Sequence, residues 1–146
     1  MAVELLSAMA GTAAFSVLFG VPRKHTLACG LIGGAGWAVY LWLAGLGGRT
    51  EAYFGASVAV ILLSRFLAVR RQCPATLFFI PGLFPLIPGV GVCWTAYYVV
   101  TDQLSLAVGT GYEAAKCVVA IVLGIVFTFE LPQRFFFVGR KGRRGL

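Results

Sequence analysis

The chain has 146 residues, of which 60% are hydrophobic and 12% are charged, and its mean hydropathy is +0.91. Soluble domains carry about 25% charged residues, so this composition excludes an ordinary soluble domain and predicts a single transmembrane domain over residues 1–146. The formal net charge of +7 comes from basic clusters that flank apolar runs, not from basic segments interleaved with aromatic residues. This placement predicts contact with a lipid bilayer and no nucleic acid as a partner.

Five apolar runs follow one another along the chain. They cover roughly residues 3–19, 26–46, 52–69, 74–100 and 114–138. A spanning helix needs about 20 residues, which four of the runs supply. The fourth run contains the sequence PATLFFIPGLFPLIPGVGVCW and is too long and too rich in proline for one plain helix. We therefore predict an all-α membrane protein with five spans, the fourth broken by a Pro/Gly segment.

The basic clusters predict the orientation of these spans. Three clusters lie in gaps between the runs or after the last run: Arg23 with Lys24, Arg70 with Arg71, and residues 140–144. Such clusters stay in the cytoplasm, whereas the gaps at 47–51 and 101–113 are expected outside. The assignments alternate only with five crossings, the N-terminus outside and the C-terminus inside. The N-terminal sequence MAVELL lacks the basic region of a signal peptide, so the first run is expected to remain as a span.

The Pro/Gly segment is the candidate substrate pathway. Its three prolines remove backbone donors and are expected to leave carbonyls unpaired, and its glycines are expected to let the backbone turn. In lipid such backbone is tolerated only where it is buried or lines a wet cavity, and transporters bind substrate at broken helices. A helix restarting here would point its positive end at an anionic group. The alternative is a kinked segment that only packs. The predicted pathway residues are Pro81, Gly82, Pro85, Pro88, Gly89, Gly91 and Thr95, whose hydroxyl would face the substrate.

Charged side chains inside apolar runs are costly in lipid and often functional. Glu130 lies toward the inner end of the last run, and Arg134 follows one turn later. The pair fits two hypotheses: a proton-coupling carboxylate, or an interfacial ion pair. Arg65, near the inner end of the third run, is expected to extend its charge to the interface. His25 is expected in a cytoplasmic loop beside Arg23.

Small residues predict a helix-packing face. Gly30 and Gly34 form a GxxxG pair, which allows close approach of helices in membranes, although the pattern is also common by chance in glycine-rich spans. The four cysteines form no CxxC pair and the chain has one histidine. We therefore predict no metal site, no disulfide framework and no cofactor.

Three segments carry a resemblance to a known family. LFGVPRK, CGLIGGAGWAVYLWL and CPATLFFIPGLFPLIPG resemble the small membrane half of the threonine/serine exporter family, over residues 1–138. In many bacteria this half is a separate subunit with a larger partner. The resemblance implies a secondary exporter of small hydrophilic metabolites in the bacterial inner membrane, with threonine and serine as substrates or, in some split relatives, a dicarboxylate. Full-length relatives resemble two fused five-span halves.

The sequence departs from the family pattern at two places. Cys93 and Trp94 stand where relatives often have a tyrosine and then a polar or basic residue, and Ser64-Arg65 stands where many have Ser-Glu. Both departures bear on the substrate more than on the fold.

Three classes of function remain open from the residues. The first is a transporter unit, acting with a larger membrane subunit of the same exporter or by self-association. The second is a membrane scaffold without a substrate. The third, an enzyme, is not favoured, because an active site needs converging acid, base or nucleophilic groups. The five acidic residues are instead dispersed along the chain: Glu4, Glu51, Asp102, Glu113 and Glu130.

Overall fold

A computed structural model of the chain describes residues 2–131, and every regular element in that range is helical. The elements are α1 (Ala2–Leu18), α2 (Arg23–Leu46), α3 (Arg49–Arg71), α4 (Thr76–Leu83), the 3-10 turn η1 (Phe84–Leu86), α5 (Gly89–Val100) and α6 (Leu104–Glu130). The prediction of an all-α fold is confirmed for this part of the chain.

The described helices provide three or four candidate membrane spans. α2, α3 and α6 are each long and apolar enough to cross a bilayer, and α4 with α5 makes a fourth if the bent pair counts as one span. α1 is apolar but shorter, with 17 residues. The chain is therefore a multi-pass helical membrane protein, while five crossings and their direction stay predictions.

The fourth run is broken, as predicted. α4 passes through Pro81 and ends at Leu83, η1 follows, and α5 begins after Pro88. The axes on the two sides of the break differ by 50°. Ile87 has an extended backbone, with ψ of 124°, as expected for a residue before proline. Because Pro88 also lacks a backbone N–H, the helix cannot continue through it.

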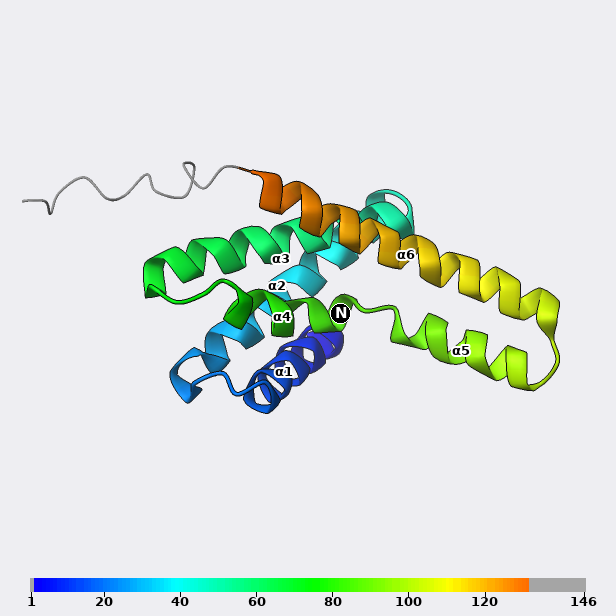
Figure 1. Cartoon of the computed structure of the whole chain (residues 1–146), viewed down its shortest axis with the longest axis horizontal. Helices are drawn as coiled ribbons and strands as arrows, with labels where there is room; N and C mark the ends of the chain where they lie inside the picture. Colours follow the sequence, from blue (N-terminus) through cyan, green and yellow to red (C-terminus); the bar gives the residue numbers. More distant parts are fainter. Residues whose placement is uncertain (1, 132–146) are drawn as a thin grey trace, which may run out of the picture.

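The helices form a compact group from which one hairpin projects. α2 contacts α1, α3 and α4, and α3 also contacts α6. Figure 1 shows α5 and the first half of α6 extending away from this group as an antiparallel pair. α5 has no buried residue and packs chiefly against α6. The break at residues 87–88 is thus the point where the chain leaves the core.

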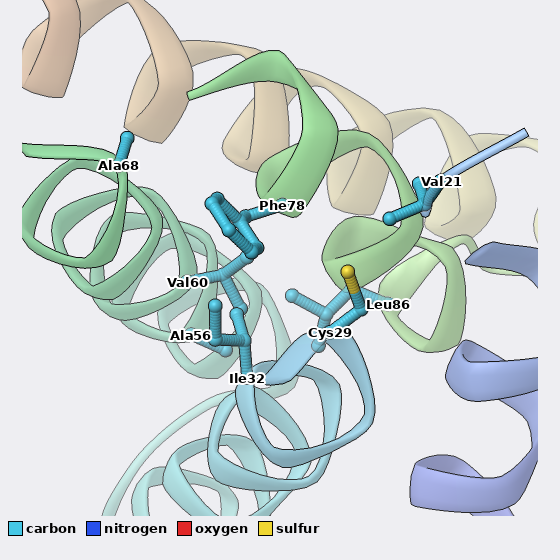
Figure 2. Close-up of a cluster of buried hydrophobic side chains, with 8 residues drawn as sticks. All are labelled: Val21, Cys29, Ile32, Ala56, Val60, Ala68, Phe78 and Leu86. Atoms are coloured by element: carbon cyan, nitrogen blue, oxygen red, sulfur yellow. The ribbon is translucent and has the colours of Figure 1, made fainter. Parts of the chain in front are cut away.

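The core lies where α2, α3 and α4 meet. Figure 2 shows side chains from these helices, from η1 and from the α1–α2 turn converging there. Phe78 of α4 is the largest fully buried side chain, and Leu86 of η1 is almost as deeply buried. Burying these side chains anchors α4 and η1 in the group of helices. The buried cluster comprises Val21, Cys29, Ile32, Ala56, Val60, Ala68, Phe78 and Leu86.

α6 begins earlier than the fifth apolar run predicted. It starts at Leu104, well before residue 114, so the connection from α5 is short. The early turns are stabilised by α5: Thr110 is hydrogen-bonded to Thr95, and a Cβ at Gly111 would lie 3.1 Å from Thr95 Cγ2. The polar residues of this stretch hid the helix from a reading based on hydropathy. The predicted continuation to residue 138 lies outside the described residues beyond Leu131.

Glycines on α2 lie directly against α1. A Cβ at Gly30 would stand 3.1 Å from Met9 O, and a Cβ at Gly34 would overlap the Met9 side chain. Gly33, between them, faces Thr12 so closely that a Cβ would collide with its hydroxyl. The close approach of α1 and α2 therefore depends on the missing side chains, as in other small-residue helix contacts.

We expect opposite effects of the same substitution at two glycines of α2. Gly33→Ala forces α1 away from α2 and lowers the free energy of unfolding by about 1–3 kcal/mol, a usual cost of overpacking. In Gly45→Ala the new Cβ meets no atom within 4 Å. This substitution raises the free energy of unfolding by about 0.5–1 kcal/mol, because alanine favours the helix. Reversible unfolding in mixed micelles measures both values. Equal effects would show that the α1–α2 contact is looser than described.

Candidate functional site

Pro81 and Gly82, the first predicted pathway residues, are buried in the core. A Cβ at Gly82 would lie 3.0 Å from Val60 Cγ1 and 3.1 Å from Ile32 Cγ2, so this glycine lets α4 pack between α2 and α3. Pro81 is also fully buried. Both residues therefore stabilise the position of the break, whatever else the segment does.

The carbonyls that the prolines free are not unpaired, contrary to the sequence-based expectation. Pro81 cannot donate to Leu77 O, and the Cys29 thiol of α2 donates to that oxygen at 3.4 Å. Pro81 O accepts a bond from the Phe84 backbone N–H. Phe84 O in turn accepts the Ile87 N–H at 3.2 Å. Shorter 3-10 bonds and one thiol thus replace the missing donors, which the sequence pattern did not indicate.

The glycines of the segment also differ from expectation. Among the described glycines only Gly20, in the α1–α2 turn, has a positive φ, of 72°. Gly89 is the first residue of α5, and a Cβ there would meet no atom within 4 Å. Gly91 faces Ala114 of α6, with 3.2 Å between a built Cβ and Ala114 Cβ. The prediction that these glycines supply a turn through a positive φ is wrong, and Gly82 and Gly91 instead provide close packing.

The start of α5 presents backbone donors next to open space. The Gly89 N–H donates to Ile87 O at 2.7 Å. The next N–H groups, those of Val90 and Gly91, have no carbonyl one turn earlier in the helix, and Pro88 supplies no side-chain cap. Thr95, one turn further on, has its hydroxyl bonded to Gly91 O at 2.7 Å and to Thr110 Oγ1 at 3.1 Å. In this structure Thr95 therefore links α5 to α6.

Two hollows lie between the described helices, only one of them beside the break. A pocket of about 120 Å³ lies between the α1–α2 turn and α4, and Pro81 is the one predicted pathway residue that lines it. A wider, apolar groove of about 520 Å³ lies between α3 and α6, away from the break. The pocket lining is Phe19, Val21, Thr76, Leu77, Ile80 and Pro81.

Glu130 is the last residue of α6 and is exposed. Its predicted partner Arg134 lies outside the described residues, so the structure does not test the pair.

Pro85, within η1, and Pro88, before α5, complete the predicted pathway residues. Within residues 2–131 no three His, Cys, Asp or Glu side chains gather as metal ligands would.

Arg65 does not extend to the interface as predicted. The side chain is 9% exposed, and its guanidinium donates to Thr128 O at 2.5 Å and Leu131 O at 3.1 Å. It also lies over the Phe129 ring, 5.3 Å from its centroid. The last carbonyls of a helix lack intrahelical donors and carry partial negative charge, which is why a cation is favourable there. Arg65 thus joins α3 to the end of α6.

His25 was expected in a loop but is the third residue of α2. It is 6% exposed, and its ring packs edge-on against Phe78 of α4 with 5.6 Å between centroids. Basic neighbours in the sequence suggested a solvated position. The helix begins two residues earlier, at Arg23, and α4 then covers the imidazole.

The long apolar helices and the interrupted α4–α5 pair define a multi-pass membrane protein with a discontinuous helix, an arrangement known from secondary transporters. The sequence profile described as "Threonine/Serine exporter, ThrE" matches residues 4–129, and the chain belongs to this family. A protein of Mycobacterium tuberculosis (strain ATCC 25618 / H37Rv) described as "Probable threonine/serine exporter" is 28% identical over 132 residues, which is 86% of this chain and 25% of that protein. The chain thus spans about a quarter of the length of this relative. No solved structure matches the present chain.

Proposed function

We propose that the chain is the membrane unit of a secondary exporter of small hydrophilic metabolites. The observation that carries the proposal is the break between α4 and α5, where a 50° bend leaves the start of a helix beside open space. A helix N-terminus attracts anionic groups, and both amino acids and dicarboxylates carry a carboxylate. Family membership supports export of threonine, serine or a related compound.

The proposed pathway follows the break. Pro88, Gly89 and the first amides of α5 would face the substrate, while Pro81 and Gly82 hold α4 in place and Pro85 shapes the 3-10 turn between them. Gly91 and Thr95 would keep α5 on α6. We place the unit in the bacterial inner membrane with a larger membrane subunit, or a second copy, supplying the rest of the pathway. Support for a partner comes from the relative in which this unit makes up only 25% of the length.

We further propose five crossings with the N-terminus outside. α3 and α6 run in the same direction, because Ser57 lies against Gly124, while Arg65, further along α3, donates to Leu131 O, just after the end of α6. A chain that crosses twice in the same direction must return between, and α4–α5 is the segment available. α1 reaches about 25 Å at 1.5 Å per residue, close to the roughly 30 Å of a bilayer core. Reporter fusions at both ends test the orientation.

Counterflow in proteoliposomes is the direct test of export. Vesicles with this chain, the candidate larger subunit or both are preloaded with unlabelled compound, and uptake of labelled threonine, serine or succinate is followed. We expect uptake of at least one compound when both chains are present. No counterflow of any of them, with both chains correctly inserted, would contradict the proposal.

The second candidate function is a membrane scaffold without a substrate. It is favoured by the pairing of the proline-freed carbonyls and by the engaged hydroxyl of Thr95. A scaffold would alter the amount or assembly of its partner and would not alter the compound transported. Transport by the partner alone at the full rate would favour this alternative.

If export is coupled to protons, we expect Glu130→Gln to reduce pH-driven uptake and to spare downhill exchange. Glu130 could change protonation during the cycle only if Arg134 leaves it in one state, because a permanent cation partner would hold it ionised. Vesicles with an imposed pH gradient measure the first quantity, and counterflow at equal pH measures the second. Glu113→Gln, at an exposed carboxylate paired with Lys116 at 2.5 Å, is the matched control. An unchanged pH-driven rate in Glu130→Gln would assign the coupling group to the partner.

A further inference from the structure

The first turn of α2 concentrates positive charge at the wrong end of a helix. Arg23 and Lys24 are its first two residues, the turn contains no acidic residue, and Pro22 supplies no side-chain cap. A helix N-terminus already carries a partial positive charge, so cations there are unfavourable. Arg71, at the end of α3, adds to this charge, because α3 packs against α2 after a two-residue connection and its end therefore returns to the start of α2.

Two buried polar atoms in the same turn lack partners. His25 Nδ1 and Thr26 Oγ1 are inaccessible to water and make no hydrogen bond. Buried polar groups are nearly always paired, because leaving them unpaired costs free energy. Both residues lie in the first four positions of α2, next to Arg23 and Lys24, whose N–H groups have no carbonyl one turn earlier in the helix. The His25 N–H is paired with Pro22 O at 2.8 Å. Phe78 supports the imidazole from the α4 side.

Basic residues beside membrane spans generally set the orientation of the spans in the bilayer, and this role accounts for the number of cations here. It does not account for a buried histidine and a threonine without partners beside them. Arg70 illustrates the ordinary case: it is exposed and lies over the Phe66 ring, 4.9 Å from its centroid. The unusual feature is that the start of a long helix, two nearby cations and an unpaired imidazole, which is only 6% exposed, occur together.

We propose that the head of α2 is an oxyanion site, formed by Lys24, His25, Thr26, Arg71 and the first backbone amides of α2. The ligand is a phosphate group, either the headgroup of an anionic lipid or a soluble phosphate. Lys24 and Arg71 neutralise its charge, the amides and the Thr26 hydroxyl donate to its oxygens, and the His25 ring turns to donate from Nδ1. The site is separate from the α4–α5 break and does not depend on the export proposal.

The single histidine of the chain makes the test specific. The full chain, labelled with ¹⁵N-histidine, is placed in phosphatidylcholine nanodiscs and titrated with inorganic phosphate, and a second sample uses nanodiscs containing phosphatidylglycerol. We expect the imidazole nitrogen signals to shift in at least one arm. Lys24→Gln and Arg71→Gln should each weaken the apparent affinity about tenfold, as expected for loss of one charge-assisted hydrogen bond.

Arg70→Gln is the matched control, because it removes the same charge from the same end of α3 and leaves the site complete. We expect its affinity to stay within about twofold of the parent. A shift with inorganic phosphate supports a soluble ligand, and a shift only with phosphatidylglycerol supports a lipid headgroup. The proposal is overturned if neither arm shifts the imidazole signals, or if Arg70→Gln weakens binding as much as Lys24→Gln does.

Discussion

Pro88→Ala is expected to lower export at least about tenfold without reducing insertion into the membrane, a change of roughly 1.4 kcal/mol in the transport barrier. Alanine restores a backbone N–H and frees Ile87 from the extended conformation that proline imposes. The 3-10 turn and α5 can then join into a longer helix, which removes the 50° bend. Counterflow in proteoliposomes measures the loss of export.

The structural part of this prediction can be checked separately. Spin labels at the exposed positions Ile80 and Val99 should move apart in Pro88→Ala as the bend straightens. Pro74→Ala, at an exposed position before α4, removes a proline without touching the break and should change neither distance nor export. Normal export in a straightened Pro88→Ala variant would show that the bend has no role in transport.

Arg65→Ala is expected to lower the free energy of unfolding by about 3 kcal/mol. Two carbonyls near the end of α6, those of Thr128 and Leu131, lose a charged donor in a buried place, and each such loss costs about 1–3 kcal/mol. Arg65→Lys keeps the charge but not the planar fork of donors, so it should fall between the parent and Arg65→Ala.

Arg70→Ala provides the control on the same helix, because Arg70 is exposed. Its effect should stay within about 0.5 kcal/mol, as for most surface substitutions. Unfolding in mixed micelles gives all three values. If Arg65→Ala and Arg70→Ala are equally stable, the contact between α3 and the end of α6 contributes nothing measurable.

Hydropathy and proline content predicted the helical class, the apolar runs and the broken fourth run, because these depend on composition over many residues. The family was also recognisable from three short segments. The start of α6 was missed, since Thr110 and Gly111 lower the hydropathy while their contact with Thr95 stabilises the helix. That contact joins two segments and is not visible in either one.

The details of the candidate site were less predictable. The sequence located the break but could not show that Cys29, far away in the chain, donates to the carbonyl freed by Pro81. Arg65 was assigned to the interface because it follows apolar residues near the end of a run. Ser57 and Ser64, both buried on α3, mark the inward face by their spacing of seven residues and were the signal that could have corrected this assignment.

Arg65 contacts carbonyls at the end of α6 that lie far along the chain: Thr128 is 63 positions and Leu131 is 66 positions after it. Long separations delay folding, because the intervening chain must be ordered before the contact forms. During synthesis α1, α2 and α3 can associate early, whereas Arg65 stays without the α6 carbonyls until residues up to Leu131 have left the ribosome. We therefore expect truncated chains that end before Leu131 to be recognised by membrane quality-control proteases, and full-length chains to escape them once α6 closes against α3.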